Sequence, residues 1–164
     1  MKNQYVADVN YCCTYGLIRA LTNRGEIEAT VAWMLTPDDL SRDGRKLEYL
    51  DAPSQWRVRD PELFDFLGGH VRRSEARTVN SIAVSGIMPG ARFHAALVPR
   101  DPMLRRAHFP ETLTAAAGSP LLFFDPDNGL QVASCPPGRS GSEKSLLWTE
   151  LAEATHAGHS VLIY

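Results

Sequence analysis

The residues of this chain that can do chemistry gather after its most apolar stretch. The run Phe123-Phe124 leads into Asp125-Pro126-Asp127-Asn128-Gly129, which places two carboxylates and one amide side by side. Two neighbouring carboxylates can bind a divalent cation, or one of them can act as an acid or base. Asp125 and Asn128 can also accept hydrogen bonds from an amine. The same residue types favour tight turns, so the segment predicts either a catalytic site or a turn.

A second acidic pair follows another apolar segment, in Thr36-Pro37-Asp38-Asp39. Asp38 or Asp39 could contact a hydroxylated ligand or cofactor at that point. The alternative is the start of an acidic helix, with Thr36 as N-cap and Pro37 in the first turn. Both acidic pairs come directly after predicted strands, so we expect them to face one crevice.

Two further segments carry weaker signals. Residues 138–145 imitate a phosphate-binding loop, but Glu143 stands where the second glycine is required. Arg139 and Lys144 leave a milder anion site open there, against a solvated loop. Trp56 lies in a polar connection close to arginines, and we expect it either to touch a ligand or base or to pack in a small cluster.

The elements that must position these residues alternate along the chain. Apolar and β-branched runs predict strands at 28–35, 92–98, 120–124 and 159–164, with a further short strand at 46–50. Helical spacing predicts helices at 8–23, from Pro61 to a stop at Gly68-Gly69, at 77–85, at 102–117 with a kink or split at Pro110, and at 142–157. Alternation of this kind predicts a parallel sheet, with ligands beyond the carboxyl ends of its strands.

Length and composition agree with one domain. The 164 residues carry a net charge of −2 and are 44% hydrophobic, which is ordinary for a globular protein and argues against a general basic nucleic-acid binder. We expect a single α/β domain over residues 1–164, with a mostly parallel, Rossmann-like sheet of about five strands flanked by helices. The chain ends within a predicted strand, so we expect a minimal version of this fold.

The cellular compartment is predicted from two kinds of segment that the sequence lacks. It has no apolar run long enough for a transmembrane helix and no signal-peptide core, so we expect a cytoplasmic protein without a membrane partner. Cys12, Cys13 and Cys135 lack zinc spacing and are interpreted as reduced thiols.

Several segments resemble an uncharacterised family of bacterial and phage proteins. They are Ala7-Asp8-Val9, Tyr15–Leu21, Trp33–Asp38, Asp43-Gly44-Arg45, Tyr49-Leu50 and the FFDPDNGL motif that ends at Leu130. This resemblance covers most of the chain but implies no settled activity. The stretch Asn10–Thr14 departs from the family, which has charged residues there.

The predicted order of strands and helices is more distantly similar to that of Rossmann-like S-adenosylmethionine-dependent methyltransferases acting on adenine amines. Their Asp-Pro-Pro-Tyr motif corresponds to Asp125-Pro126-Asp127-Asn128, whereas their glycine-rich loop is replaced by Leu35–Asp39. The leading hypothesis is therefore a nucleotide- or nucleic-acid-modifying enzyme of methyltransferase-like type. Asp125, Asp127 and Asn128 would be catalytic, and Asp38 or Asp39 would contact S-adenosylmethionine.

Two alternatives remain. One is a phosphodiesterase or nuclease that binds Mg²⁺ through Asp125 and Asp127. The other is a non-catalytic protein of a mobile genetic element that forms homo-oligomers.

Overall fold

A computed structural model describes residues 1–39, 41–72 and 77–164 of the chain. It divides into two compact units. The sheet unit contains Met1, residues 27–37 and residues 90–164, and the helical unit contains residues 2–26 and 38–89. The two acidic pairs fall on different units, since Asp125 and Asp127 belong to the sheet unit and Asp38 and Asp39 to the helical unit.

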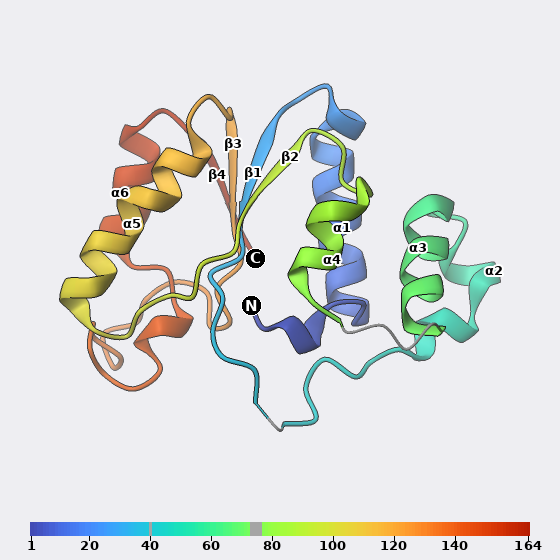
Figure 1. Ribbon diagram of the computed structural model, residues 1–164, viewed down its shortest axis with the longest axis horizontal. Coiled ribbons are helices and arrows are strands. Elements are labelled where there is room, and N and C mark those ends of the chain that lie inside the picture. Colours follow the sequence, from blue (N-terminus) through green and yellow to red (C-terminus); the bar gives the residue numbers. More distant parts are fainter. Residues whose placement is uncertain (40, 73–76) are drawn as a thin grey trace. The chain divides into compact units, whose positions relative to one another are not determined.

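The sheet unit is built on four parallel strands in the order β2-β1-β3-β4 (Figure 1). They are β1 (Ala29–Ala32), β2 (Ala91–His94), β3 (Leu121–Phe124) and β4 (Ser160–Ile163). Each lies within or overlaps a predicted apolar segment, so the α/β class and the parallel sheet are confirmed. The two inner strands are almost wholly buried and the two edge strands are partly exposed, which explains why β3 is a continuous apolar run.

The expected strand at 46–50 is wrong. A 3-10 helix occupies Glu48–Asp51 instead, and Tyr49 and Leu50 pack with Phe64 in a small apolar cluster. Two adjacent apolar residues can be buried by a helical turn as well as by a strand. The sheet therefore has four strands in the described residues, against an expectation of about five.

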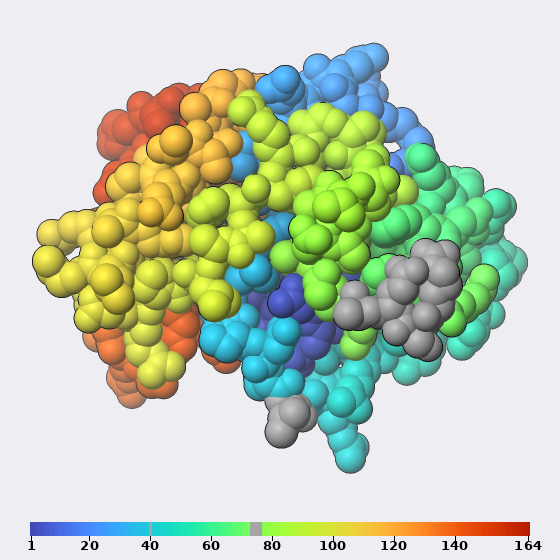
Figure 2. Space-filling view, viewed as in Figure 1, coloured from blue at the N-terminus to red at the C-terminus, as the bar shows by residue number. Residues whose placement is uncertain are grey.

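Helices α5 (Pro102–Ala116) and α6 (Trp148–His156) cover one face of the sheet (Figure 1). The β2–β3 and β3–β4 connections cross the sheet in the same direction, and right-handed crossovers then place both helices on the same face. Asp101 caps α5 by accepting hydrogen bonds from the N–H groups of Met103 and Leu104, both at 2.9 Å. The outer side of α5, in yellow, lies at the surface in Figure 2.

Two expected features of these helices are corrected. Of the kink or split expected at Pro110, the split is wrong, because α5 is one helix through that residue. The helix expected from residue 142 begins only at Trp148, after a 3-10 turn at Ser142–Lys144. The intervening Leu146 forms a parallel bridge with Leu130, so its backbone pairs with another segment and cannot continue a helix.

The helical unit contains α1 (Val9–Leu21), α2 (Pro53–Trp56), α3 (Pro61–Arg72) and α4 (Val79–Ser85), with 3-10 turns at Asn3–Tyr5 and Asn23–Gly25. Asp8 begins α1 by accepting a hydrogen bond from the N–H of Asn10 at 3.0 Å. α3 runs through Gly68-Gly69 to Arg72, so the expected stop is wrong there.

No helix within the described ranges has both the length and the apolar character that crossing a bilayer requires.

Candidate functional site

The order of the strands locates the candidate site. Along the chain β1 leads to its neighbour β2, whereas β3, on the other side of β1, leads to β4, so the order of the strands reverses between β1 and β3. In open parallel sheets this reversal creates a crevice at the carboxyl ends of the strands, where ligands bind. Asp125 directly follows β3, and Thr36 lies shortly after β1. We call the group Met1, Thr36, Asp125 and Asp127 the edge site.

Asp125 is the more deeply buried of the two carboxylates, with 1% of its surface exposed. Its backbone continues the pairing of the two central strands, because its N–H donates to the carbonyl oxygen of Ala32 at 3.2 Å. Its own carbonyl oxygen accepts a hydrogen bond from the amino group of Met1 at 2.9 Å. The end of β3 therefore contributes a backbone acceptor as well as a carboxylate.

Asp127 holds two partners. One carboxylate oxygen lies 2.7 Å from the amino group of Met1, and the other accepts a hydrogen bond from the Thr36 hydroxyl at 2.9 Å. The Asp127 side chain is only 6% exposed, so this ion pair is shielded from solvent and stronger than a surface pair. The Asp127 charge is thus balanced within the sheet unit.

The amino group of Met1 shows what kind of group the edge site holds. It contacts the Asp127 carboxylate, the carbonyl oxygen of Asp125 and, at 3.4 Å, the carbonyl oxygen of Met34. Three oxygens around one nitrogen are the arrangement that binds an amine or ammonium group. Met34 adopts a left-handed φ of 46°, a conformation that is rare for a bulky residue and often found near functional sites.

Thr36 and Met1 are members of the edge site that sequence reasoning missed. One of the two alternatives for this segment made Thr36 the N-cap of a helix, but its hydroxyl donates to Asp127 and its N–H donates to the Met1 carbonyl oxygen at 2.9 Å. The position of Thr36 beyond a predicted strand was the available signal. Met1 carried no signal, since its contact with Asp125 joins residues that are 124 positions apart.

Asn128 differs from the two aspartates because it is exposed. Its N–H donates to the carbonyl oxygen of Lys144 at 2.8 Å, and the next residue, Gly129, accepts from the N–H of Leu146 at 3.0 Å. These bonds fix the turn after β3 against residues 144–146. The segment is therefore both a turn and part of the edge site, and Asn128 is its solvent-facing member.

In residues 138–145, the segment that imitates a phosphate-binding loop, a side chain of the protein occupies the position of an anion. Glu143 accepts a hydrogen bond from the N–H of Gly141 at 3.0 Å and two from Arg100, at 3.0 and 3.1 Å. Burial alone would raise the pKa of the Glu143 carboxyl, but the hydrogen bonds from Arg100 and from backbone N–H groups lower it. A carboxylate of the chain thus takes the place that a bound anion would use.

Asp38 and Asp39 are exposed side chains of the helical unit. Asp38 accepts from the side chain of Asn3 at 3.2 Å, and Asp39 accepts from Lys2 and, at 3.2 Å, from Gln4. The hydrogen bond from the Lys2 ammonium holds the pKa of the Asp39 carboxyl well below its usual range. Both carboxylates therefore fasten the first residues of this unit.

The Mg²⁺ alternative rests on two carboxylates, Asp125 and Asp127, and the structure describes both within residues 1–39, 41–72 and 77–164. Within those ranges, no three His, Cys, Asp or Glu side chains gather where they could hold one ion. Asp127, which the alternative hypothesis assigned to Mg²⁺, is already paired with the Met1 amino group.

No protein-family model, curated protein or solved structure matches this chain.

Proposed function

We propose that the edge site recognises the amino group of a nucleobase, as expected of a nucleotide- or nucleic-acid-modifying protein of methyltransferase-like type. The observation that carries this proposal is the set of three oxygens, from Asp127, Asp125 and Met34, around the amino group of Met1. The exocyclic amine of adenine or cytosine presents N–H donors to the same acceptors. It would replace the Met1 amino group, and the exposed Asn128 would add a further acceptor.

S-adenosylmethionine is the cofactor that the methyltransferase resemblance implies, and the residues after β1 fit it poorly. Leu35–Asp39 stand in place of a glycine-rich loop, and they are preceded by Trp33 and Met34. Trp33 is fully buried and stacks on Phe93, with the two ring centres 5.8 Å apart. We therefore assign no reaction step to this cofactor and no cofactor contact to Asp38 or Asp39.

Matched pairs of nucleosides test the proposal. In calorimetric titrations, adenosine and cytidine should bind more tightly than inosine and uridine, which present a carbonyl oxygen where the amine would be. A hydrogen bond to a charged group contributes about 1.5–3 kcal/mol, so the preference should be roughly 10- to 100-fold. Equal affinities within each pair, or no heat with any of them at millimolar concentration, would contradict amine recognition.

Two variants locate the binding. Asp127→Asn, which removes the charge, and Asn128→Ala, at an exposed position that should not disturb folding, are both expected to weaken adenosine binding. Asp38→Asn is the matched control, because this exposed carboxylate belongs to the helical unit. A parallel titration with S-adenosylmethionine tests the enzyme class: saturable heat would support methyl transfer, and no heat at millimolar concentration would remove it.

A further inference from the structure

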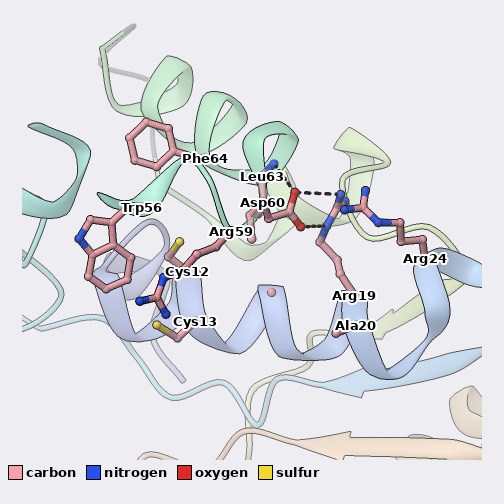
Figure 3. A pocket seen from close by; sticks show the side chains of 11 residues that line it. Cys12, Cys13, Arg19, Ala20, Arg24, Trp56, Arg59, Asp60, Leu63 and Phe64 are labelled. Carbon is pink, nitrogen blue, oxygen red and sulfur yellow. Dashed lines mark hydrogen bonds and ion pairs between the residues drawn. The ribbon is translucent and has the colours of Figure 1, made fainter. Parts of the chain in front are cut away.

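The helical unit contains a cavity of about 350 Å³ that the edge site does not involve. It lies between α1 and the α2–α3 region (Figure 3). Gly16 and Ala20 stand one helical turn apart on its α1 side, and their small size leaves the space open. Pockets of about 300–1,000 Å³ are typical of small-molecule sites. We call this cavity the α1–α3 pocket.

The α1–α3 pocket has an excess of positive charge. Arg19, Arg24 and Arg59 line it, together with the single carboxylate of Asp60. Arg19 is buried, and its guanidinium lies 2.7 Å from that carboxylate. Asp60 is thereby neutralised inside the pocket. Glu62 lies 2.6 Å from Arg19 and 3.7 Å from Arg24, which is 61% exposed, so the three arginines outnumber the two carboxylates beside them. The remaining positive charge favours an anionic ligand.

One end of the pocket is a platform for an aromatic ring. Trp56 is half-buried there, and an edge contact with Tyr49, at 5.5 Å between ring centres, fixes its orientation. The Arg59 guanidinium lies over the Trp56 ring at 5.5 Å. An arginine together with a tryptophan is a combination on which nucleic acid bases stack. Figure 3 shows Trp56 toward one end of the pocket and Arg24 toward the other.

We infer that the α1–α3 pocket binds a nucleoside monophosphate, with the base against Trp56 and Arg59 and the phosphate at Arg24. A nucleoside monophosphate carries a flat base at one end and an anionic phosphate at the other, and these correspond to the aromatic end and the arginine end of the pocket. This site lies wholly within the helical unit, so it does not depend on amine recognition at the edge site.

Two thiols line the same pocket and allow binding to be measured directly. Cys13 is exposed, whereas burial raises the pKa of the half-buried Cys12 thiol to about 11. Cys13 should therefore be the pocket thiol that reacts at neutral pH, because it is exposed and the Cys12 thiol forms little of the reactive thiolate there. Cys135 belongs to the sheet unit and serves as the internal control.

The experiment is alkylation with N-ethylmaleimide, followed for each cysteine by peptide mass spectrometry. Adenosine 5′-monophosphate or uridine 5′-monophosphate should slow the alkylation of Cys13 about tenfold at a concentration ten times the Kd, because bound protein is protected. Cys135 should react at an unchanged rate. Adenosine should protect much less because it lacks the phosphate.

Variants assign the protection to the pocket. Trp56→Ala and Arg24→Gln should each raise the concentration needed for protection roughly tenfold. Trp56→Phe keeps an aromatic ring and should retain most of the protection. This result would show that the weaker protection in Trp56→Ala comes from the missing ring and not from a folding defect. Arg57→Gln is the matched control, since this arginine is next to Trp56 but pairs with Asp65 at 2.7 Å and does not line the pocket.

The inference would be wrong if millimolar monophosphates did not protect Cys13. It would also be wrong if protection persisted in Trp56→Ala and Arg24→Gln, or if adenosine protected Cys13 equally well. Protection by a single-stranded oligonucleotide but not by monophosphates would also refute it. Asp127→Asn should leave Cys13 protection intact, so failure of the edge-site proposal and failure of this one are distinguishable.

Discussion

Arg105 is the buried cation that holds the loop after the edge site to helix α5. Its guanidinium donates to both carboxylate oxygens of Glu150, at 2.7 and 2.8 Å. It also donates to the carbonyl oxygens of Ser142 and Ser145, at 2.7 and 2.6 Å. Arg105 is 3% exposed and Glu150 is 5% exposed. One side chain therefore joins α5 to α6 and to the turn that precedes it.

The change Arg105→Met should destabilise the chain severely. It leaves the buried Glu150 carboxylate with the N–H of Leu147, which donates to it at 2.9 Å, and without its arginine. It also removes a donor from each of two carbonyl oxygens. Breaking a buried ion pair from one side costs about 3–5 kcal/mol. At about 2–4 °C of melting temperature for each kcal/mol in a chain of this length, Tm should fall by roughly 10 °C.

Urea unfolding followed by circular dichroism measures this cost. The double variant Arg105→Met/Glu150→Met should recover part of the loss, because two apolar side chains replace the charges. Arg100→Met is the control: its ion pair with Glu143 involves a side chain that is 56% exposed, so its loss should cost about 1 kcal/mol or less. A loss below about 1 kcal/mol for Arg105→Met, or strict additivity in the double variant, would refute the reasoning.

Gly44→Ala should lower the unfolding free energy by about 1–3 kcal/mol, because a Cβ at this left-handed position would lie 2.4 Å from the carbonyl oxygen of Gln4. Gly86→Ala is the control and should cost less, because Gly86 is also left-handed but a Cβ there would have nothing within 4 Å. Equal costs in urea unfolding would contradict the clash at Gly44. Burial lowers the pKa of His94 and His108. The unfolded chain therefore binds more protons than the folded chain below about pH 6.5, and stability should fall as pH decreases through that range. The double variant His94→Gln/His108→Gln should flatten this dependence of stability on pH, and an unchanged slope would contradict the role of these histidines.

The strands were predicted well because burial on both faces leaves a strong trace in sequence. Leu121–Phe124 is apolar throughout, and the structure buries three of its four residues. Short apolar pairs carry less information, since the Tyr49-Leu50 pair can be buried by a helical turn. Helix ends failed where distant contacts override local preference: Leu146 pairs with Leu130, and α3 continues through two glycines.

The candidate site was predicted only in part for the same reason. The position of Asp125 and Asp127 after a buried strand follows from local pattern and the rule for parallel sheets. Their partners do not, because Thr36 and Met1 reach Asp127 only through the tertiary fold. The pocket that contains Trp56 was suggested by one aromatic residue near arginines. Its volume, its small α1 residues and the pairing of Arg19 with Asp60 depend on helix packing that no local pattern encodes.

The two proposed sites differ in how their charges are balanced, and this determines how each should bind. At the edge site the Asp127 charge is already satisfied by an amino group in a shielded position. A neutral base amine must replace an ion pair there, so its affinity should be modest and depend on hydrogen-bond geometry. In the α1–α3 pocket, the three arginines outnumber the two carboxylates, Asp60 and Glu62, that pair with them. A phosphate there gains from exposed charges that salt screens. Binding in the pocket should therefore weaken steeply as ionic strength rises, and binding at the edge site should not.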